Sequence, residues 1–244
     1  RQRMNCFYSN RIVGNLARLS DEDARHALKS LRLKTGDTIV LVVDGQRYAA
    51  VLEARGGEVF ARTTVPLPGT EPGVRVTLYQ GLPKGERMDD IVRRCTEAGV
   101  YAVAPCIMAR SVARPDEAAR QARRTRWQKV AREAAMQSGR TVVPEIRDFL
   151  ASGDIRTELQ KHEQALVAWE EATENSLRRV YRDVKDVAIV IGPEGGISRD
   201  EILDMRATPF TLGPRIFRTE TAGLAAIVSL FTLTGDTEYG QDRD

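Results

Sequence analysis

The stretch AIVIGPEGGISRDEILDMRATPFTLGPRIFRTETAGLAA, residues 188–226, decides the fold of this chain. It begins with a short apolar run that is typical of a buried strand, and it holds two loops with glycine, 192–196 and 212–222. Glycines at the carboxyl end of a strand let the backbone approach a ligand closely, and an open α/β sheet binds ligands at that edge. The two loops therefore predict one ligand pocket, which the apolar run 224–233 closes.

Strand and helix candidates alternate from residue 74 onward, which predicts an α/β domain with a parallel sheet and helices on its faces. Ser198 is expected to cap a short helix that begins at Arg199. The apolar spacing predicts strands at 75–80, 100–107, 164–169, 186–191 and 210–212 and helices at 86–98 and 116–138.

The residues before this domain form short strand candidates at 38–44, 48–54 and 58–64. Asp44-Gly45 and Gly56-Gly57 separate them and are hairpin signals. One helix, capped by Ser20, is expected at 21–31. A small, mostly antiparallel β-barrel with one helix fits this pattern. The Pro- and Gly-rich segment 66–73 reads as a linker, so we expect two domains, 1–70 and 74–244.

The composition excludes several classes of protein. The net charge is only +3 over 244 residues, and the two histidines and three cysteines are not at metal-ligand spacing. We therefore expect reduced thiols and no metal site. The apolar runs are too short for a membrane span and no signal sequence is visible, so we expect no membrane partner and a cytoplasmic protein.

Basic residues gather in two places. Lys84 and Arg87 follow the strand at 75–80, in a loop that matches neither a dinucleotide fingerprint nor a phosphate loop of ATP-binding enzymes. They are either phosphate ligands or solvated surface charges. The segment 110–132 carries eight basic residues against Asp116 and Glu117. Such a stripe either neutralises nucleic-acid phosphates or is a solvated helix face.

The second glycine loop decides between two interpretations of the first. The segment 192–196 is either a tight turn from strand to helix or a ligand loop. The second loop places Arg215, Arg218 and Glu220 beside a glycine turn and before an apolar helix, where charges usually have a function. The pair of loops therefore favours a binding site.

At these loops the sequence resembles the RsmE family of ribosomal RNA methyltransferases, within the SPOUT superfamily of knotted enzymes. The resemblance covers nearly the whole chain, with departures at Lys29-Ser30 and at Phe217. The motifs that carry it are GPEGG at 192–196, LGPRIFRTETA at 212–222, KGERMDDIVRRCTEAGV at 84–100, RWQKVAREAAMQSGR at 126–140 and HALKSLRLK at 26–34. The last of these resembles a PUA-like RNA-binding module.

The resemblance implies a PUA-like β-barrel followed by an α/β SPOUT methyltransferase domain with a deep trefoil knot. It also implies methylation, dependent on S-adenosyl-L-methionine, of N3 of one uridine in the 16S rRNA of the 30S ribosomal subunit, near the decoding centre, by a homodimer. Two alternatives stay open. One is a SPOUT methyltransferase acting on another RNA such as tRNA, and the other is an RNA-binding protein without catalysis.

The resemblance also implies roles for individual residues. The expected cofactor-binding residues are Gly192, Pro193, Glu194, Gly195, Gly196, Leu212, Gly213, Ile216, Arg218 and Ala222. The expected RNA-binding residues are Arg32, Lys84, Arg87, Arg110 and Arg140. A sulfonium cofactor needs no metal, which agrees with the missing ligands.

Two residues are expected to be catalytic, Arg218 and Glu220. The acceptor nitrogen of uracil carries a proton at neutral pH and becomes a nucleophile as that proton leaves. Arg218 is expected to stabilise the developing negative charge, and Glu220 to orient Arg218 or accept the proton. Alternatively, Glu220 is a carboxylate interacting with the start of a helix. Glu194 is expected to cap loop amides rather than touch the substrate.

Overall fold

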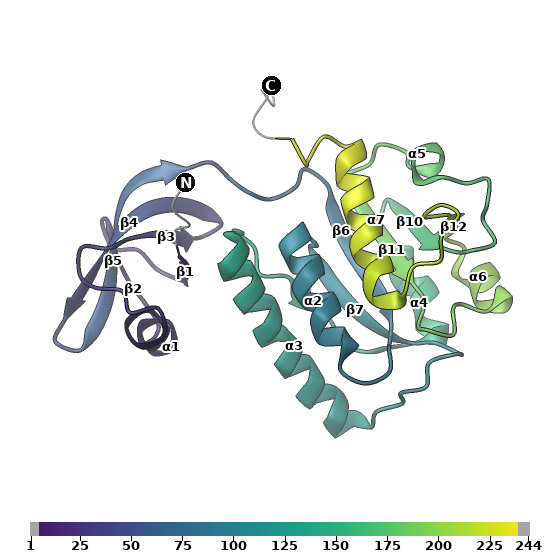
Figure 1. Cartoon of the computed structure of the whole chain (residues 1–244), viewed down its shortest axis with the longest axis horizontal. Coiled ribbons are helices and arrows are strands. Elements are labelled where there is room, and N and C mark those ends of the chain that lie inside the picture. Colours follow the sequence, from purple (N-terminus) through teal and green to yellow (C-terminus); the bar gives the residue numbers. More distant parts are fainter. Residues whose placement is uncertain (1–4, 239–244) are drawn as a thin grey trace. The chain divides into compact units, whose positions relative to one another are not determined.

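The computed structural model describes residues 5–238, and these divide into two compact units (Figure 1). The first holds residues 5–71 and 135–142, and the second holds 72–134 and 143–238. The ends of the predicted domains, 1–4 and 239–244, lie outside the described residues. The two domains expected from the sequence, 1–70 and 74–244, stay a prediction.

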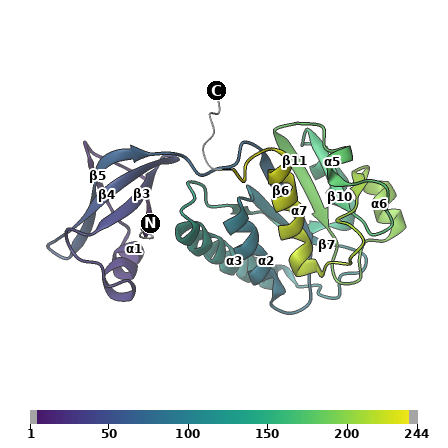
Figure 2. The same ribbon diagram turned by 45° about the horizontal axis from the view of Figure 1, so that its top comes forward.

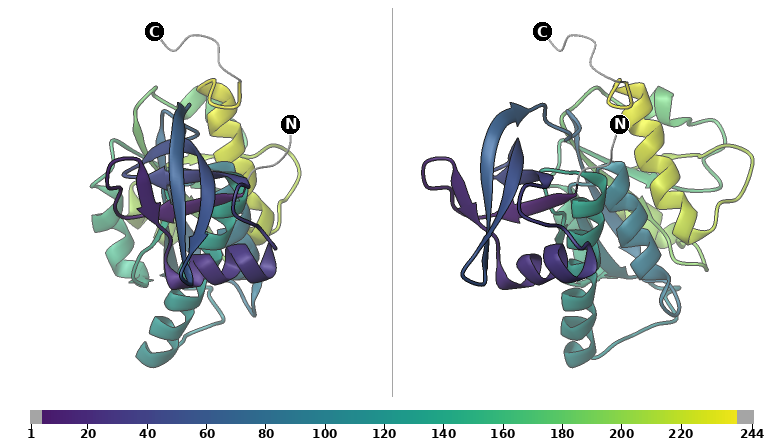
Figure 3. Two further views of the ribbon diagram at one scale, coloured as in Figure 1. Left: turned by 90° about the vertical axis from the view of Figure 1, so that its left-hand side faces the viewer. Right: turned by 60° about the vertical axis from the view of Figure 1, so that its left-hand side comes forward.

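The first unit is a curled five-stranded sheet with one short helical segment (Figure 3). Its strands follow the order β1-β3-β4-β5-β2, and only the β1–β3 pair is parallel. The elements are β1 (Cys6–Ser9), β2 (Leu16–Arg18), α1 (Asp21–Arg25), the π-helical turn η1 (His26–Ser30), β3 (Thr38–Val43), β4 (Gln46–Arg55) and β5 (Glu58–Leu67).

Both predicted hairpins of this unit are present. Asp44 and Gly45 have φ angles of 49° and 75°, the left-handed pair that a two-residue hairpin turn requires. The predicted barrel is observed as a curled sheet with β1 and β2 at its edges. The predicted helix at 21–31 is divided, because the backbone changes from α1 to η1 at His26. Ser20 caps α1 as expected, since its hydroxyl accepts a hydrogen bond from the amide of Asp23 at 3.1 Å.

The second unit is an α/β layer structure whose main sheet runs β12-β10-β11-β6-β7-β8, with every pair parallel. Residues 135–138 of α3 belong to the first unit. The elements are β6 (Arg75–Gly81), α2 (Arg87–Ala98), β7 (Ala102–Ile107), α3 (Glu117–Ser138), β8 (Glu145–Ile146), β9 (Leu150–Ala151), α4 (Ser152–Leu159), β10 (Gln164–Ala168), α5 (Leu177–Val180), β11 (Asp186–Ile191), α6 (Arg199–Met205), β12 (Thr208–Phe210) and α7 (Thr219–Leu233).

Alternate residues of the central strand β6 divide the core of this unit. Leu78 packs in the cluster that includes Ile91 of α2 and Ile227 of α7, whereas Tyr79 packs with Ile155 of α4 on the opposite face. Figures 1 and 2 show α2 and α7 together over one face of the sheet. Because side chains of a strand alternate between faces, a sheet covered on both sides needs the continuous apolar runs that the sequence has.

Each predicted strand of this unit corresponds to an observed one, with differences at 100–107 and 210–212, and the short strands β8 and β9 were not predicted. The sequence favoured 210–212, but β12 is Thr208–Phe210, so Thr211 and Leu212 lie beyond the sheet. Pro209 lacks a donor for the ladder, which made this edge strand hard to recognise. The strand expected at 100–107 begins at Ala102, since the amide of Val100 still closes the end of α2 by donating to Cys95.

Candidate active site

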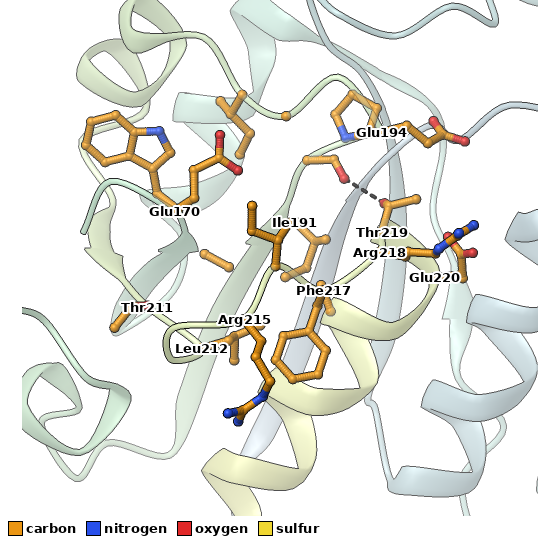
Figure 4. Close-up of a pocket in the computed structure, with 18 of the residues that line it drawn as sticks. Glu170, Ile191, Glu194, Thr211, Leu212, Arg215, Phe217, Arg218, Thr219 and Glu220 are labelled. Carbon is orange, nitrogen blue, oxygen red and sulfur yellow. Dashed lines mark hydrogen bonds between the residues drawn. The ribbon is translucent and has the colours of Figure 1, made fainter. Parts of the chain in front are cut away.

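A pocket of about 980 Å³ lies where the carboxyl ends of β6, β10, β11 and β12 meet (Figure 4). Ligands bind at this edge of open α/β sheets because the loops that follow the strands gather there. Its walls combine apolar side chains with the two glycine loops. The lining includes Lys84, Arg87, Val112, Trp169, Glu170, Ile191, Gly192, Pro193, Glu194, Gly196, Ile197, Thr211, Leu212, Gly213, Arg215, Ile216, Phe217, Arg218, Thr219, Glu220 and Ala222.

The first glycine loop is a tight turn and a wall of the pocket at once. Gly196 has a φ of 71°, and its amide donates to the carbonyl of Pro193 at 2.8 Å. The loop also lies against the end of β6: a β-carbon at Gly81 would be 2.5 Å from the backbone nitrogen of Pro193. The predicted tight turn is therefore present, and it brings the backbone of this loop to the pocket. That this backbone holds a ligand stays a prediction.

Glu194 ties this loop to the loop after β6. Its carboxylate accepts a hydrogen bond from the amide of Lys84 at 2.9 Å and pairs with the guanidinium of Arg87. Burial alone would raise the pKa of Glu194, but hydrogen bonds from two backbone amides and from Arg87 hold that pKa below its usual value. Glu194 thus caps an amide, as the sequence led us to expect.

The second glycine loop begins with a turn around Gly213, which has a φ of 102° and whose amide donates to Thr211 Oγ1 at 3.1 Å. Leu212 and Phe217 pack against the core of the unit. Ile216 lies at the open rim with 85% of its surface exposed. The predicted apolar pair Leu212 and Ile216 does line the pocket, with Leu212 partly buried against the core and Ile216 exposed.

The two loops are joined at the start of α7. The hydroxyl of Thr219 donates to the carbonyl of Gly192 at 2.6 Å, the contact drawn as a dashed line in Figure 4. The same oxygen accepts a hydrogen bond from Gln80 Nε2 at 2.9 Å. This contact fixes the position of Thr219, and with it the chain neighbours Arg218 and Glu220.

Arg218 and Glu220 both line the pocket, Arg218 as the N-cap residue of α7 and Glu220 in its first turn. Figure 4 shows both side chains extending from the start of that helix. Neither side chain has a hydrogen bond or ion pair within residues 5–238, so the structure does not show the expected contact between them. A carboxylate in the first turn also interacts favourably with the helix dipole, so both expected roles of Glu220 fit this position.

The five residues expected to bind RNA lie in different surroundings. Lys84 and Arg87 line the pocket, and Arg110 donates to the carbonyl of Gly195 at 2.9 Å, so it supports the first glycine loop. Arg32 is exposed in the first unit. Arg140 is only 3% exposed and pairs with Glu71 inside that unit. This burial argues against direct contact of Arg140 with RNA, because its guanidinium already stabilises a carboxylate.

Several arginines of the predicted positive stripe at 110–132 form ion pairs and hydrogen bonds inside the second unit. Arg124 pairs with Asp148 and donates to the carbonyl of Ile146, and Arg126 pairs with Asp89 at 2.6 Å. These contacts join α3 to its neighbours. A charge run can therefore be structural as well as solvated or phosphate-binding, a third role that its composition did not suggest.

Trp169, Glu170 and Thr219 are among the pocket residues that were not predicted from the sequence. Trp169 and Glu170 come directly after β10, and Thr219 lies close to the two charged residues that drew attention instead. The signal for Trp169 and Glu170 was available: parallel strands end at the same edge, so the residues that follow them converge.

Other reactive side chains lie away from the pocket lining. All three cysteines are free and buried, and burial raises the pKa of Cys6 to about 11 and of Cys95 to about 12, so neither is a ready nucleophile. No group of three potential metal ligands occurs in the described part of the chain. Between residues 5 and 238, the helices are also too short or too polar to cross a bilayer.

Comparison with known proteins places both units. Residues 70–230 match the family model of an RNA methyltransferase domain, and residues 19–62 match that of an RNA methyltransferase PUA domain. A protein of Mycobacterium bovis named ribosomal RNA small subunit methyltransferase E is 33% identical over 93% of this chain and 91% of its own length. The Bacillus subtilis protein of that name is 29% identical over 87% and 88% of the two chains.

Solved structures of similar proteins have the same fold. The ribosomal RNA small subunit methyltransferase E of Neisseria gonorrhoeae, bound to S-adenosyl methionine, superposes with a TM-score of 0.82 at 29% identity, over 94% of this chain and 98% of its own. A methyltransferase of Legionella pneumophila with the same bound cofactor gives 0.84 at 29% identity, over 95% and 98%.

Proposed function

The chain belongs to the family of RNA methyltransferases that includes ribosomal RNA small subunit methyltransferase E, and from this premise we propose that it methylates N3 of one uridine in 16S ribosomal RNA. S-adenosyl-L-methionine is the methyl donor, as it is the bound cofactor of the Neisseria protein. The substrate is the RNA of the 30S subunit, and the reaction takes place in the cytoplasm, where ribosomal subunits are assembled and used.

The pocket fits the proposed cofactor. It is an apolar cavity with a few convergent polar groups, which is typical of cofactor sites. The backbone of residues 192–196 would hold the cofactor, since Gly192 and Gly196 line the pocket without a side chain. A β-carbon at Gly192 would also lie 2.8 Å from Ile197 Cγ1, so this position has no room for one. Gly213, Leu212 and Ile216 hold it from the second loop, with Arg218 and Ala222 at the start of α7.

When bound, the cofactor supplies an electrophilic methyl group. The chain's own task is to make N3 of uracil a nucleophile, which requires that its proton leaves as the new bond to carbon forms. The guanidinium of Arg218 stabilises the negative charge that develops on the uracil oxygens. The carboxylate of Glu220 accepts the N3 proton or holds Arg218 in place for this task.

RNA is held by positive side chains of both units. Lys84 and Arg87 border the pocket, and Arg32 is exposed in the first unit, which acts as a PUA-like RNA-binding domain. We leave Arg140 out of this set because it is buried in an ion pair. Arg110 acts mainly by holding the glycine loop.

The proposal includes a homodimer and a deep trefoil knot in the second domain, both implied by the resemblance to the family. Val228 and Leu233 on α7 are each 41% exposed, and this apolar surface supports burial against a second copy. The two glycine loops, 192–196 and 212–222, line one pocket and are joined by the Thr219 hydroxyl, which is consistent with the knot.

One observation carries the proposal: Arg218 and Glu220 meet both glycine loops at a single pocket. The test is methyl transfer from labelled S-adenosylmethionine to 30S subunits that lack the modification, followed by mapping of the labelled base. Label at N3 of one uridine of 16S RNA is the expected result. Label on tRNA alone, or on a ribose oxygen, would overturn the proposed substrate or the proposed atom.

A further inference from the structure

The hydroxyl of Thr219 lies between the amide of Gln80 and the carbonyl of Gly192, and we propose that Gln80 and Thr219 form a positioning relay, which acts on Gly192 and shapes the first glycine loop for the cofactor. The relay joins three separate elements: β6, the start of α7 and the loop after β11. Neither Gln80 nor Thr219 needs to touch the substrate for this role.

The hydrogen bonds of the relay have fixed directions. A carbonyl oxygen only accepts, so the single proton of the Thr219 hydroxyl is donated to Gly192 at 2.6 Å. The Thr219 oxygen must then accept from Gln80 Nε2, at 2.9 Å. The other amide hydrogen of Gln80 is donated to the carbonyl of Gly81 at 3.0 Å. Every donor is used, and the Gln80 amide has only one orientation that satisfies them.

Gln80 is costly to bury in this orientation. Its side chain is fully buried at 0% exposure, and its Oε1 has no hydrogen-bond partner. An unsatisfied buried acceptor destabilises a fold. An apolar residue of similar size would avoid this cost and fill the same space beside Gly223 and Cys95. The presence of glutamine at this position is therefore best explained by the two oxygens to which its side-chain amide donates, those of Thr219 and Gly81.

The relay acts on the segment of the pocket that is richest in glycine. Residues 192–196 include three glycines, and glycine loses more conformational freedom on ordering than any other residue. A loop that is already ordered binds its ligand more tightly, because it loses less conformational entropy when the ligand binds. By anchoring the carbonyl of Gly192, the relay fixes the first residue of this loop relative to α7, from which Arg218 and Glu220 extend.

The test compares variants by calorimetric titration with S-adenosylmethionine. Thr219→Val keeps the shape of the side chain and removes the hydroxyl, and we expect it to weaken cofactor affinity about tenfold. Thr219→Ser keeps the hydroxyl and should stay within about twofold of the wild type. Gln80→Met removes the amide and should weaken binding in the same direction. Because both variants break one relay, the double variant should bind no more weakly than Thr219→Val alone.

Thr232→Val is the matched control. Thr232 lies on the same helix, and its hydroxyl also donates to a backbone carbonyl, that of Val228 at 2.8 Å, but it is not part of the pocket. It should keep wild-type affinity. If Thr219→Val does not fold, the comparison of Gln80→Met with Thr232→Val decides the question.

The inference rests on the proposed cofactor, but the result that would overturn the proposed function differs from the result that would overturn the relay alone. A wild-type protein that does not bind S-adenosylmethionine would overturn the proposed function and the relay with it. If the wild type binds but Thr219→Val and Gln80→Met bind equally well, the relay alone is overturned. A lower melting temperature with unchanged affinity would have the same meaning, because the contact would then serve the fold and not the loop.

Discussion

The guanidinium of Arg87, in the first turn of α2, pairs with the carboxylate of Glu194, in the loop after β11. The two residues are 107 positions apart in the chain. Their pairing joins the loops that follow two adjacent parallel strands, β6 and β11. It also holds the side chain of Glu194, in the middle of a glycine loop, against the loop that follows β6.

The first prediction concerns the pH dependence of this pair. Because the pKa of Glu194 is below 4.5 in the folded protein, its ionised form contributes stability above about pH 4.5, and this is lost as the pH falls through the folded pKa. Glu194→Gln removes the contribution. We expect the difference in unfolding free energy between wild type and Glu194→Gln to be constant near neutral pH and to shrink below pH 4.5, measured by urea titration at several pH values.

The second prediction concerns the two proposed catalytic residues. Removing a group that stabilises developing charge lowers kcat by about 10²–10³-fold, so Arg218→Ala and Glu220→Gln should each lose most methyl transfer to 30S subunits. Arg178→Ala is the control, since Arg178 is exposed on α5. Single-turnover rates at saturating cofactor give the measurement. Wild-type turnover in both variants would refute the assignment.

The third prediction uses the close approach of Gly81 to Pro193. A β-carbon there would lie 2.5 Å from two atoms of Pro193, so Gly81→Ala must displace the first glycine loop. We expect a loss of about 1–3 kcal/mol in stability and weaker cofactor binding. Gly69→Ala is matched to it, because no atom lies within 4 Å of the added carbon. Equal melting temperatures and affinities for the two variants would contradict the close packing.

The fourth prediction separates burial from RNA binding in the first unit. Arg140→Gln leaves the Glu71 carboxylate without its charged partner, which should destabilise the protein by about 3 kcal/mol. Arg32→Gln, at an exposed residue, should leave stability within about 0.5 kcal/mol. It should instead weaken RNA binding and lower the salt dependence of log K by about one. The opposite pattern, with Arg140 affecting only RNA affinity, would restore Arg140 as an RNA-binding residue.

The fifth prediction concerns the capping box of α6. Glu201 accepts hydrogen bonds from the amides of Ala109 and Ser198 and from the hydroxyl of Ser152. Burial alone would raise its pKa, but these hydrogen bonds hold the pKa below 4.5. Glu201→Gln should therefore cost about 1–2 kcal/mol at pH 7, and less below pH 4.5. Asp200→Asn, on the exposed side of the same turn, should cost under about 0.5 kcal/mol. Chemical denaturation of both variants distinguishes them.

Local rules in the sequence were sufficient for much of this fold. Ser198 was predicted as an N-cap and does accept from the amide of Glu201 at 3.3 Å, because a helix start needs a side-chain acceptor whatever surrounds it. The strand at 186–191 was predicted with its observed bounds, since a fully buried strand must be continuously apolar. The two glycine loops were likewise visible as breaks between such runs.

Long-range partners were not visible, because they depend on which elements become neighbours. Arg140 and Glu71, Arg110 and Gly195, and Gln80 and Thr219 are all far apart in the chain. Nothing in the local pattern distinguishes an arginine that binds phosphate from one that holds a carboxylate or a carbonyl.

The stretch 188–226 by itself determined an α/β domain with two loops at one edge of a sheet, since strand period, glycine position and helix capping are properties of short segments. Only the tertiary structure decided that the Thr219 hydroxyl ties these loops together and that Glu194 faces Arg87. Hydrogen bonds and ion pairs reach only a few ångströms, so they form between whatever groups the packing of distant elements brings together.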